Sequence, residues 1–463
     1  MNVVFAIAEA YPFVKVGGLG DVGGSLPKAL ARLGHHVTLV LPRYPGMGKG
    51  RKLLSLDIPM GSAVERVEVR EHGRHKGVHV YTAGNRRHFP RVYGYADHHV
   101  DPFVLFSKTV IDFAAASPAP PDVIHCNDWH CALGPQYARL GPHRDTLERA
   151  ATILTIHNLS YQGRFGTRAE RLIGLGSAGG SSLLARGIAF ADAVNTVSRG
   201  YLEEILAPGR GMGLGGLLRS HPGPLQGILN GVDYDEFDPR TDPHITLTYD
   251  VVSPDGKRAN KSALQRESGM TVDGDAPLFG MVARLVNQKG IDLLCAAIDG
   301  LVGRGGQVVT MGVGEPRYVR ALRAAAARNP GSVAYLPTSA EADARRVYAG
   351  SDFFLAPSLY EPCGLGPLIA LRYGAIPLVR RTGGMADTIA DYRSDSASGL
   401  GFTYRERSVR GFLSAADAAL AVYRNAEEWR TLRRRAMAAD FSWDRPSREY
   451  ELLYRRALET RAG

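Results

Sequence analysis

Short apolar segments alternate with stretches of helical periodicity along most of this chain. Val3–Ala8 and Pro277–Ala283 are two such segments, and each is followed, after a polar loop, by a stretch with helical spacing. Alternation of this kind is typical of parallel β-sheets in which helices connect successive strands. The sequence therefore predicts an α/β protein with parallel sheets.

The predicted strands form two groups separated by a connector. Residues Asp233–Asp275 are rich in Pro, Asp and Gly and have weak periodicity, which indicates a connecting region. The strands predicted before it are Val3–Ala8, His36–Leu41, Val78–Tyr81, Val123–His125, Thr152–Ile156, Ala193–Val197 and a short one near Gly227–Asn230. The strands predicted after it are Pro277–Ala283, Gln307–Met311, Val333–Leu336, Phe353–Ala356 and Ile376–Val379.

The length of the chain indicates more than one domain. A chain of 463 residues is too long for a single hydrophobic core and is expected to fold as two domains. In each half a helix preceded by glycine is predicted after the first strand, at Gly23–Leu33 and at Gly290–Leu301. A last helix over Arg448–Leu458 is predicted to pack back across the domain boundary. Because ligands of open parallel sheets bind beyond the carboxyl ends of the strands, a cleft between the halves is the expected site.

The composition is that of an ordinary globular protein, with 44% hydrophobic and 22% charged residues. No apolar run approaches the roughly 18 residues that a membrane-spanning helix needs. The segment Met1–Glu9 lacks a basic region and reaches an acidic residue early, so it predicts a first strand rather than a signal peptide. A cytoplasmic protein without a membrane partner is therefore expected.

The formal net charge of +10 comes mostly from arginines in predicted helices such as Arg317–Arg328 and Arg430–Arg435. Runs of this kind are usually solvated helix faces. A positive surface also attracts anionic substrates, but without specificity. Nucleic acid is not an expected partner, because no basic motif with interleaved aromatic residues is present.

No metal site is indicated by the metal-ligating residue types. The cysteines are widely spread and include no CxxC pair, which argues against a zinc site and against a disulfide framework. They are Cys126, Cys131, Cys295 and Cys363.

A candidate anion site lies at Leu355–Leu368. An apolar strand is followed by the carboxylate of Glu361, and small residues then lead directly into a predicted helix. The unpaired N–H groups and the positive dipole end of such a helix favour phosphate, and Glu361 is placed to accept hydrogen bonds from sugar hydroxyls. This combination indicates a nucleotide-sugar site. The alternative is that Gly and Pro here only shape a strand-to-helix turn.

The segment Gly18–Gly23 matches the GxGxxG pattern of dinucleotide-binding oxidoreductases. That fingerprint requires its first glycine immediately after the first strand, whereas residues 9–17 intervene here. Leu41–Arg43 also stands where an acidic residue is expected after the second strand. A flexible glycine loop that carries Lys15 toward an anion is the favoured interpretation.

Short motifs lie along the whole chain at Lys15–Val22, His125–His130, Thr155–Gly163, Leu229–Asp233, Ala283–Gly290, Glu361–Leu365, Arg380–Gly384 and Asp440–Trp443. In this order they closely resemble the signature motifs of bacterial glycogen synthases and plant starch synthases. The resemblance implies the GT-B fold, with two Rossmann-like domains that face a cleft. It further implies an acceptor-side domain of residues 1–240, a nucleotide-sugar domain of residues 241–440, and a C-terminal helix within 441–463 that returns to the first domain.

The resemblance also implies the reaction. It is the transfer of glucose from ADP-glucose to the non-reducing end of an α-1,4-glucan such as glycogen or maltodextrin, with retention of configuration. A nucleophile mechanism needs a second carboxylate, and the position eight after Glu361 is Ile369. A same-face mechanism is therefore the better hypothesis. No cofactor and no metal are expected, because cationic side chains and a helix end neutralise the diphosphate.

Site residues follow from the matched motifs. In the catalytic set two cations grip the diphosphate, a histidine contacts the donor sugar, and a glutamate orients that sugar or stabilises its developing positive charge. The catalytic set is Glu361, His157, Arg284 and Lys289. The donor-binding set is Lys15, Gly17, Gly18, Asp21, Asn230, Gly364, Leu365, Gly366, Thr382 and Gly383. The acceptor and sugar set is Asp128, Trp129, His130, Asn158 and Tyr161.

Structural alternatives stay open for several of these residues. Arg284 and Lys289 could form a surface pair on a loop. Asp21 either contacts sugar or caps the helix near Gly23. Trp129 either stacks on a glucose face or is a core tryptophan. His157, at a strand end, could also be structural.

The chain departs from the family pattern at three places. Gly366-Pro367 stands where the family has Thr-Gln, and a proline is tolerated at the first helical position. The segment Asp101–Phe106 has Pro102 and Leu105 where the family has Asn and Arg. The stretch Gly163–Arg186 is short and glycine-rich, with Arg186 in place of a common Lys. These departures leave open the acceptor preference, the efficiency and the base of the donor. Rival functions are a related transferase with another donor or acceptor, and a catalytically impaired glucan-binding protein.

Overall fold

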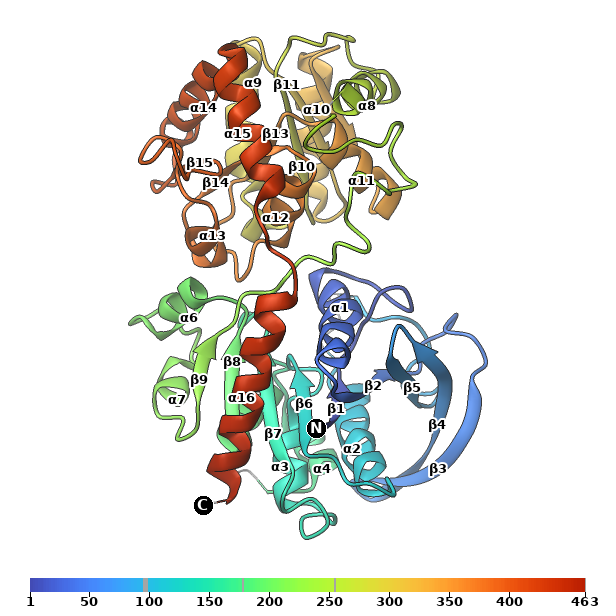
Figure 1. Cartoon of the computed structure of the whole chain (residues 1–463). Helices are drawn as coiled ribbons and strands as arrows, with labels where there is room; N and C mark the ends of the chain where they lie inside the picture. Colours follow the sequence, from blue (N-terminus) through green and yellow to red (C-terminus); the bar gives the residue numbers. More distant parts are fainter. Residues whose placement is uncertain (95–98, 177–178, 254, 463) are drawn as a thin grey trace. The chain divides into compact units, whose positions relative to one another are not determined.

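The computed structural model describes residues 1–94, 99–176, 179–253 and 255–462. These residues form two compact units, which we describe separately (Figure 1). Unit 1 comprises Met1–Gly231 together with Trp443–Gly463, and unit 2 comprises Val232–Ser442. The resemblance placed the corresponding boundaries at residues 240 and 440.

Unit 1 is built on one sheet with the strand order β3-β4-β5-β2-β1-β6-β7-β8-β9. Neighbouring strands from β5 to β9 are parallel, whereas β4 pairs antiparallel with both β3 and β5. The strands are β1 (Asn2–Ala6), β2 (His36–Pro42), β3 (Arg51–Met60), β4 (Ala63–His75), β5 (Val78–Gly84), β6 (Val123–Asn127), β7 (Ala151–Ile156), β8 (Ala193–Thr196) and β9 (Leu225–Gly227).

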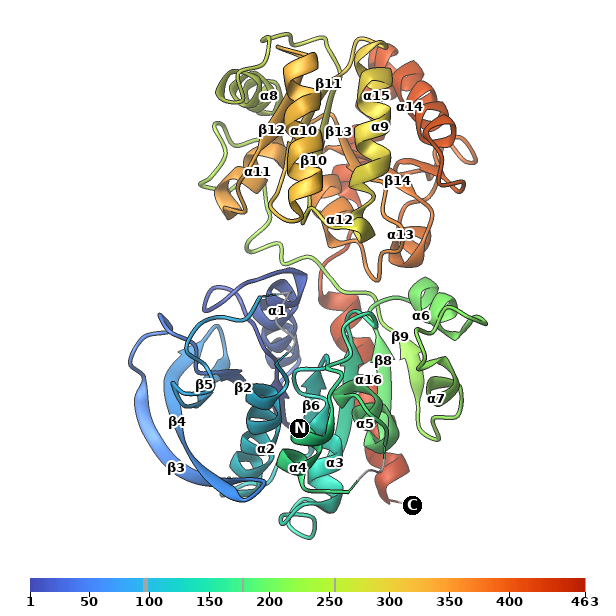
Figure 2. The same cartoon turned by 180° about the vertical axis from the view of Figure 1, so that it is seen from behind.

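Helices cover both faces of this sheet, as Figures 1 and 2 show from opposite sides. One face carries α1 (Gly18–Arg32) and α16 (Asp444–Ala462), and the other carries α2 (Asp101–Ala115), α3 (Leu133–Leu140) and α5 (Leu183–Phe190). Strands buried on both faces read as continuous apolar runs, which explains why they were predictable. The remaining helices of unit 1 are α4 (Thr167–Ile173), α6 (Arg199–Leu206) and α7 (Gly215–Arg219).

The C-terminal helix α16 is held in unit 1 by buried tyrosines. The hydroxyl of Tyr454 lies 2.7 Å from Nδ1 of His125 on β6. The hydroxyl of Tyr450 accepts a hydrogen bond from the amide of Asn195 on β8, at 3.1 Å. Both tyrosines are fully buried. The predicted return of this helix to the N-terminal domain is confirmed.

Unit 2 contains one parallel sheet with the strand order β12-β11-β10-β13-β14-β15. Its strands are β10 (Leu278–Val282), β11 (Gln307–Met311), β12 (Val333–Leu336), β13 (Phe353–Ala356), β14 (Ile376–Arg380) and β15 (Phe402–Tyr404). Its helices are α8 (Asp255–Glu267), η1 (Asn287–Lys289, a 3₁₀ turn), α9 (Ile291–Val302), α10 (Pro316–Arg328), α11 (Glu341–Gly350), α12 (Leu365–Arg372), α13 (Gly383–Thr388), α14 (Val409–Arg424) and α15 (Ala426–Ala438). The prediction of two domains with parallel sheets is therefore confirmed, apart from the antiparallel pairing of β4 in unit 1. Among the residues that the structure describes, no helix has both the length and the apolar character needed to cross a bilayer.

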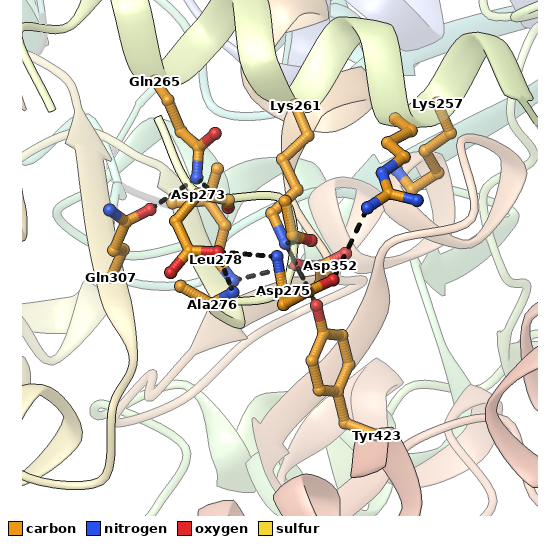
Figure 3. A network of polar contacts seen from close by, with 12 residues as sticks. Lys257, Lys261, Gln265, Asp273, Asp275, Ala276, Leu278, Gln307, Asp352 and Tyr423 are labelled. Atoms are coloured by element: carbon orange, nitrogen blue, oxygen red, sulfur yellow. Dashed lines mark hydrogen bonds and ion pairs between the residues drawn. The ribbon is translucent and has the colours of Figure 1, made fainter. Parts of the chain in front are cut away.

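Helix α8 lies in the segment that was predicted to be a connector. Its inner face carries polar side chains, which find partners beside the first residues of the strands (Figure 3). Nζ of Lys261 lies 2.7 Å from Oδ2 of Asp352 and donates to the hydroxyl of Tyr423 at 3.0 Å. The same carboxylate oxygen accepts the N–H of Leu278 at 2.9 Å. The sequence prediction failed here because buried, paired polar groups replace the apolar side chains that a periodicity search detects.

Strands β3, β4 and β15 were also not predicted. In β4, Val67 and Val69 are buried while charged residues alternate with them and Val64 remains exposed. A hairpin with one solvated face shows apolar residues at every second position rather than in a run. Because β4 contains no continuous apolar run, its sequence did not predict a strand. The short strand near Gly227–Asn230 lies slightly earlier than predicted, at Leu225–Gly227.

Candidate functional site

Three segments of unit 2 meet beyond the carboxyl ends of β10, β13 and β14. Lys289 ends the turn η1 after β10, and Glu361 lies in the loop after β13. Nζ of Lys289 is 2.6 Å from Oε2 of Glu361, and Oγ of Ser358 donates to the same oxygen at 2.9 Å. The structure thus brings together a cation and a carboxylate that were predicted from separate motifs.

The loop that carries Glu361 is fixed by backbone contacts. Nε of Arg380 donates to the carbonyl of Ser358 at 2.7 Å, and its guanidinium also donates to the carbonyl of Leu359. The N–H of Leu359 donates to the carbonyl of Gln288 at 2.7 Å, which joins this loop to η1. Arg380 and Gln288 therefore position the carboxylate, a role that the sequence analysis assigned to neither.

Two glycines allow these segments to approach each other. Gly290 has φ +69, and a Cβ there would lie 2.1 Å from the carbonyl oxygen of Pro357. Gly383 has φ +48, and a Cβ there would lie 2.0 Å from the carbonyl oxygen of Glu361. Both positions combine left-handed backbone with close contact, so only glycine fits without displacement. Gly383 was predicted to bind donor, and its packing adds a structural reason for glycine.

Helix α12 begins directly after Gly364, whose φ is +87. Pro367 is the third residue of this helix rather than the first, which corrects the expectation that it stands at the first position. Because proline has no N–H, it removes one of the free donors that a helix N-terminus offers. The N–H groups of Leu365 and Gly366 remain at the predicted anion site.

Two further residues that were predicted to contact the sugar donor lie at the same end of the sheet of unit 2. Arg284 is half-buried in the loop between β10 and η1. Thr382 is a buried residue directly before α13. The predicted contact of Arg284 with the diphosphate and the predicted contact of Thr382 with the donor stay predictions.

In unit 1 the buried carboxylate of Glu9 anchors the segment that carries Lys15. Its Oε2 accepts the N–H groups of Val16 and Gly17 at 2.5 and 2.9 Å, and the hydroxyl of Tyr93 donates to Oε1 at 2.5 Å. Burial raises the pKa of Glu9, against hydrogen bonds that favour the charged form. Glu9 was not among the site residues predicted from the sequence. Its signal was an acidic residue just beyond an apolar first strand.

The glycine-rich stretch after Lys15 is helical, and the prediction of a flexible loop is wrong. Helix α1 begins at Gly18 and not near Gly23, because the glycines let it pack against the preceding backbone. A Cβ at Gly23 would lie 2.2 Å from the carbonyl oxygen of Glu9. Asp21 therefore lies inside the first turns and does not cap the helix. Its carboxylate is 2.8 Å from Nζ of Lys15.

Asp128 links the ends of two neighbouring strands of unit 1. It follows β6 with φ +59, and its carboxylate faces the backbone N–H groups of Trp129, His157 and Asn158. The side chain is buried, and burial raises its pKa to about 8. These contacts give Asp128 a structural role, while its predicted contact with sugar stays a prediction.

Asp128→Asn is expected to change how stability depends on pH. Because the folded-state pKa is raised from 3.8 to about 8, folding favours the protonated acid. The stabilisation is complete below the unfolded pKa and is lost as the pH rises through the folded pKa, by up to about 1.4 kcal/mol per pH unit. Between pH 3.8 and about pH 8, the wild type should therefore lose free energy of unfolding relative to Asp128→Asn.

Urea unfolding followed by circular dichroism at a series of pH values checks this prediction. Asp145→Asn removes an exposed carboxylate of the same unit, whose side chain is 90% exposed, and serves as the control. Its curve should run parallel to that of the wild type. Parallel curves for Asp128→Asn would contradict the assignment.

Trp129 has the contacts of a core residue. It is 6% exposed, and the ring centroids of His130 and Phe103 lie 4.2 and 4.8 Å from its own. A Cβ at Gly163 would come within 2.5 Å of the indole. The described residues therefore cover the indole, and they give no support to stacking on a glucose ring.

Three predicted site residues of unit 1 carry buried polar atoms that lack a partner among the described residues. Both ring nitrogens of His130 belong to this group, as do Oδ1 of Asp128 and Oδ1 of Asn230. Burial lowers the pKa of His130 to about 3, so its ring is neutral at physiological pH. Buried polar groups are nearly always paired, and orphaned ones indicate a place for a ligand or water.

His157 follows β7 and is oriented by its neighbour across the sheet. The ring Nε2–H donates to Oδ1 of Asn127 at 3.0 Å, and the amide of Asn127 in turn donates to the carbonyl of Ala6 at 3.1 Å. Burial lowers the pKa of His157 to about 3. The imidazole is therefore neutral, and Asn127 fixes its tautomer. This role of Asn127 was not predicted from the sequence.

Asn158 and Tyr161 close the turn after β7. Oδ1 of Asn158 accepts hydrogen bonds from the N–H and the hydroxyl of Ser160, at 3.1 and 2.7 Å. The N–H of Tyr161 donates to the carbonyl of Asn158 at 3.1 Å. Tyr161 is half-buried. Their predicted contacts with the acceptor stay predictions.

The short glycine-rich stretch Gly163–Arg186 is organised by its last residue, apart from residues 177 and 178, which lie outside the described part. Arg186 is fully buried, and one guanidinium nitrogen donates to both oxygens of Glu170 at 2.7 and 2.6 Å. The guanidinium also donates to the carbonyls of Gly176 and Gly180. This departure from the family pattern therefore has a structural role inside unit 1.

The described residues include no group of three or more His, Cys, Asp or Glu side chains arranged to hold a metal ion. The cysteines Cys126, Cys131 and Cys363 are buried, and Cys295 is partly buried.

Comparison with known proteins gives matches for both halves of the chain. Residues 2–220 match the family model "Starch synthase catalytic domain", and residues 267–420 match "Glycosyl transferases group 1". The chain is 41% identical to a glycogen synthase of Moorella thermoacetica, over 100% of this chain and 98% of the relative. It is 40% identical to a glycogen synthase of Geotalea daltonii, over 99% of each chain.

Solved structures show the same fold. The catalytic domain of starch synthase IV from Arabidopsis thaliana, bound to ADP and acarbose, aligns over 99% of both chains, with a TM-score of 0.93 and 32% identity. Sucrose-phosphate synthase from Thermosynechococcus elongatus aligns over 99% of both chains, with a TM-score of 0.66 and 18% identity, which is a likeness of fold alone.

Proposed function

Because this chain belongs to the glycogen synthase family of glycosyltransferases, we propose that it transfers glucose from ADP-glucose to the non-reducing end of an α-1,4-glucan. The ADP and the acarbose in the starch synthase structure support this choice of donor and acceptor. The full-length match to glycogen synthases favours glycogen as the product of repeated transfer.

The observation that carries the proposal is the meeting of Lys289, Glu361 and the start of α12 in unit 2. A cation and free N–H groups favour a diphosphate, while a carboxylate beside them favours sugar hydroxyls. The departing ADP gains negative charge as the glycosidic bond breaks, so fixed positive groups stabilise the transition state more than the ground state. In this proposal Lys289 and Arg284 neutralise that charge, and Glu361 orients the transferred glucose.

Unit 1 supplies the remaining proposed contacts. The segment anchored by Glu9 would present Lys15, Gly17 and Gly18 to the sugar donor. Oδ1 of Asn230, which has no partner among the described residues, would accept a hydrogen bond from the substrate. Neutral His157 would contact the glucose. The buried His130 would form a hydrogen bond with the glucan acceptor, and the buried Trp129 would support the His130 ring by packing against it.

A same-face mechanism follows from the single carboxylate at this position. The position eight residues after Glu361 holds Ile369 and not a second carboxylate. Ile369 lies one turn into α12 and is 5% exposed. The leaving phosphate would then accept the proton of the incoming hydroxyl on the face that the diphosphate leaves, which retains configuration. Side-chain cations and helix N–H groups supply the neutralising charge, so we propose that no metal cofactor is needed.

Incubation of the purified protein with ADP-glucose or UDP-glucose and short maltodextrins tests the proposal. Chain extension with ADP-glucose is the expected result. Extension with UDP-glucose alone would favour a related transferase with another donor. Binding of maltodextrin without any product would favour an impaired glucan-binding protein, and NAD should not bind.

Replacement of Pro367 is expected to tighten the binding of ADP. Both Pro367→Gln and Pro367→Ala add an N–H group at the third position of α12, where the current residue has none. A hydrogen bond to a charged group contributes about 1.5–3 kcal/mol net, so we expect an affinity gain of about 10- to 150-fold. Isothermal titration calorimetry with ADP measures it. Because the alanine variant adds only the N–H, equal or weaker binding in both variants would exclude the helix start as the phosphate site.

A further inference from the structure

The contact between Lys289 and Glu361 joins two side chains that the proposed function assigns to different parts of one substrate. Lys289 is assigned to the diphosphate and Glu361 to the sugar. In the structure their charged atoms lie 2.6 Å apart, and the side chains are only 21% and 11% exposed. Lys289 cannot direct the same N–H groups at a diphosphate and at this carboxylate. The ammonium has three N–H donors in all, so release of the carboxylate frees one more of them for the diphosphate.

The surroundings of the pair favour movement of the lysine side chain alone. The N–H of Leu359 donates to the carbonyl of Gln288, and the amide of Gln288 donates to the carbonyl of Tyr360 at 3.3 Å. These contacts fix the backbone on both sides of the pair. Lys289 has a long flexible stem and a rotatable ammonium group, so it can turn without movement of the backbone.

Glu361 keeps a hydrogen-bond donor when the lysine turns away. Oγ of Ser358 donates to the same Oε2 at 2.9 Å, and Arg380 holds the carbonyl of Ser358 at 2.7 Å. A buried carboxylate that lost all donors would be costly, but this one retains a neutral donor and becomes available to sugar hydroxyls. The local structure therefore supports two arrangements of the same residues.

We propose that Glu361 competes with the donor diphosphate for Lys289. When the donor binds, the diphosphate replaces Glu361 as the partner of this lysine. The inference rests on the proposed function. In the ligand-free protein the carboxylate neutralises the ammonium. When the diphosphate arrives, it takes over Lys289, and Glu361 is released toward the glucose. The carboxylate is thus presented to the sugar only when the diphosphate is in place, and its return to Lys289 favours release of ADP after transfer.

A purely positioning role for Glu361 predicts the opposite effect on binding. If the carboxylate only holds Lys289 in the correct place, its removal weakens ADP binding. If it competes with the diphosphate, its removal strengthens ADP binding, because no ion pair has to be broken before Lys289 can bind ADP. The direction of the change therefore separates the two roles.

The test is the dissociation constant of ADP for the full chain, measured by calorimetry for the wild type, Glu361→Gln, Lys289→Met and the double variant. We expect Glu361→Gln to bind ADP about tenfold more tightly, within the range of coupling between contacting side chains, while its turnover falls. In the Lys289→Met background the same substitution should have no effect on ADP affinity.

A nearby carboxylate provides the matched control. Oε1 of Glu315 accepts the N–H of Asn287 at 3.3 Å, on the same turn that ends in Lys289. Glu315→Gln should leave ADP affinity within about twofold, since it removes a charge without freeing Lys289. An equal gain in this variant would mean that general electrostatics, and not partner exchange, strengthens binding, and would overturn the inference.

The outcomes distinguish the inference from the function on which it rests. A wild type that binds ADP and extends maltodextrin, together with a Glu361→Gln variant that binds ADP no more tightly, overturns the exchange and leaves the function in place. A wild type that neither binds ADP nor transfers glucose overturns the proposed function and the exchange with it.

Discussion

Lys289→Ala and Glu361→Ala are each expected to lower kcat with maltodextrin and ADP-glucose by about 10²–10³-fold, the loss typical of removing one preorganised charge-stabilising group. Lys289 is proposed to stabilise the charge of the departing diphosphate, and Glu361 to orient the glucose. The two side chains lie 2.6 Å apart in unit 2. Steady-state kinetics with a saturating donor measures the effect on kcat.

Folding stability must be measured beside turnover. Each variant leaves one partner of a largely buried pair, so a loss of about 1–2 kcal/mol in the free energy of unfolding is expected. That is a fraction of the roughly 5–15 kcal/mol typical of folded proteins, and the variants should remain folded in the assay. Asp417→Ala breaks an exposed ion pair with Arg304 in the same unit and is the control. Unchanged kcat in both site variants would remove the site assignment.

Arg186→Met is expected to lower the free energy of unfolding by about 3–5 kcal/mol, a large loss for a single substitution. The guanidinium is fully buried and satisfies both oxygens of Glu170 as well as two backbone carbonyls. Its removal leaves a carboxylate and these carbonyls without their donor. Urea unfolding of the full chain measures the change. Arg186→Lys keeps the charge but loses the planar fork, so its loss should be intermediate.

Arg168 offers the matched control for this prediction. It forms an ion pair with Asp101 at 3.0 Å in the same region of unit 1, but its side chain is 81% exposed. Arg168→Met should therefore change the free energy of unfolding by about 0–1 kcal/mol. Equal losses in the two methionine variants would show that burial does not determine the importance of Arg186.

Most strands were predictable because their signal is local. Strands β11, β12 and β13 have the predicted bounds, and most of their residues are apolar and adjacent in sequence. Strand β4 escaped prediction because only one of its faces is buried. Helix α8 escaped because Lys261 and its neighbours are buried with partners that come from remote parts of unit 2. Periodicity detects apolar burial, but it does not detect polar burial.

The site residues divide in the same way. Lys289 and Glu361 stood out because each lies in a short motif beside a predicted strand end. Glu9 and Asn127 were not predicted, because their role is to position other residues. Glu9 anchors the segment of Lys15, and Asn127 orients His157. For Arg380 a signal was present, since it lies in a matched motif, but its contact with the backbone of Ser358 is visible only in three dimensions.

Consecutive apolar residues and short motifs were enough to predict the α/β class, the two largely parallel sheets, the family and the strand ends where charged residues gather, because these features are recorded locally. Which charges meet is visible only in the folded molecule. The tertiary structure paired Lys289 with Glu361, started α1 at Gly18, buried Trp129 and placed Pro367 at the third position of α12. The physical reason is that each of these outcomes depends on the burial of one segment against another that is remote in the chain, and no local pattern records that free energy.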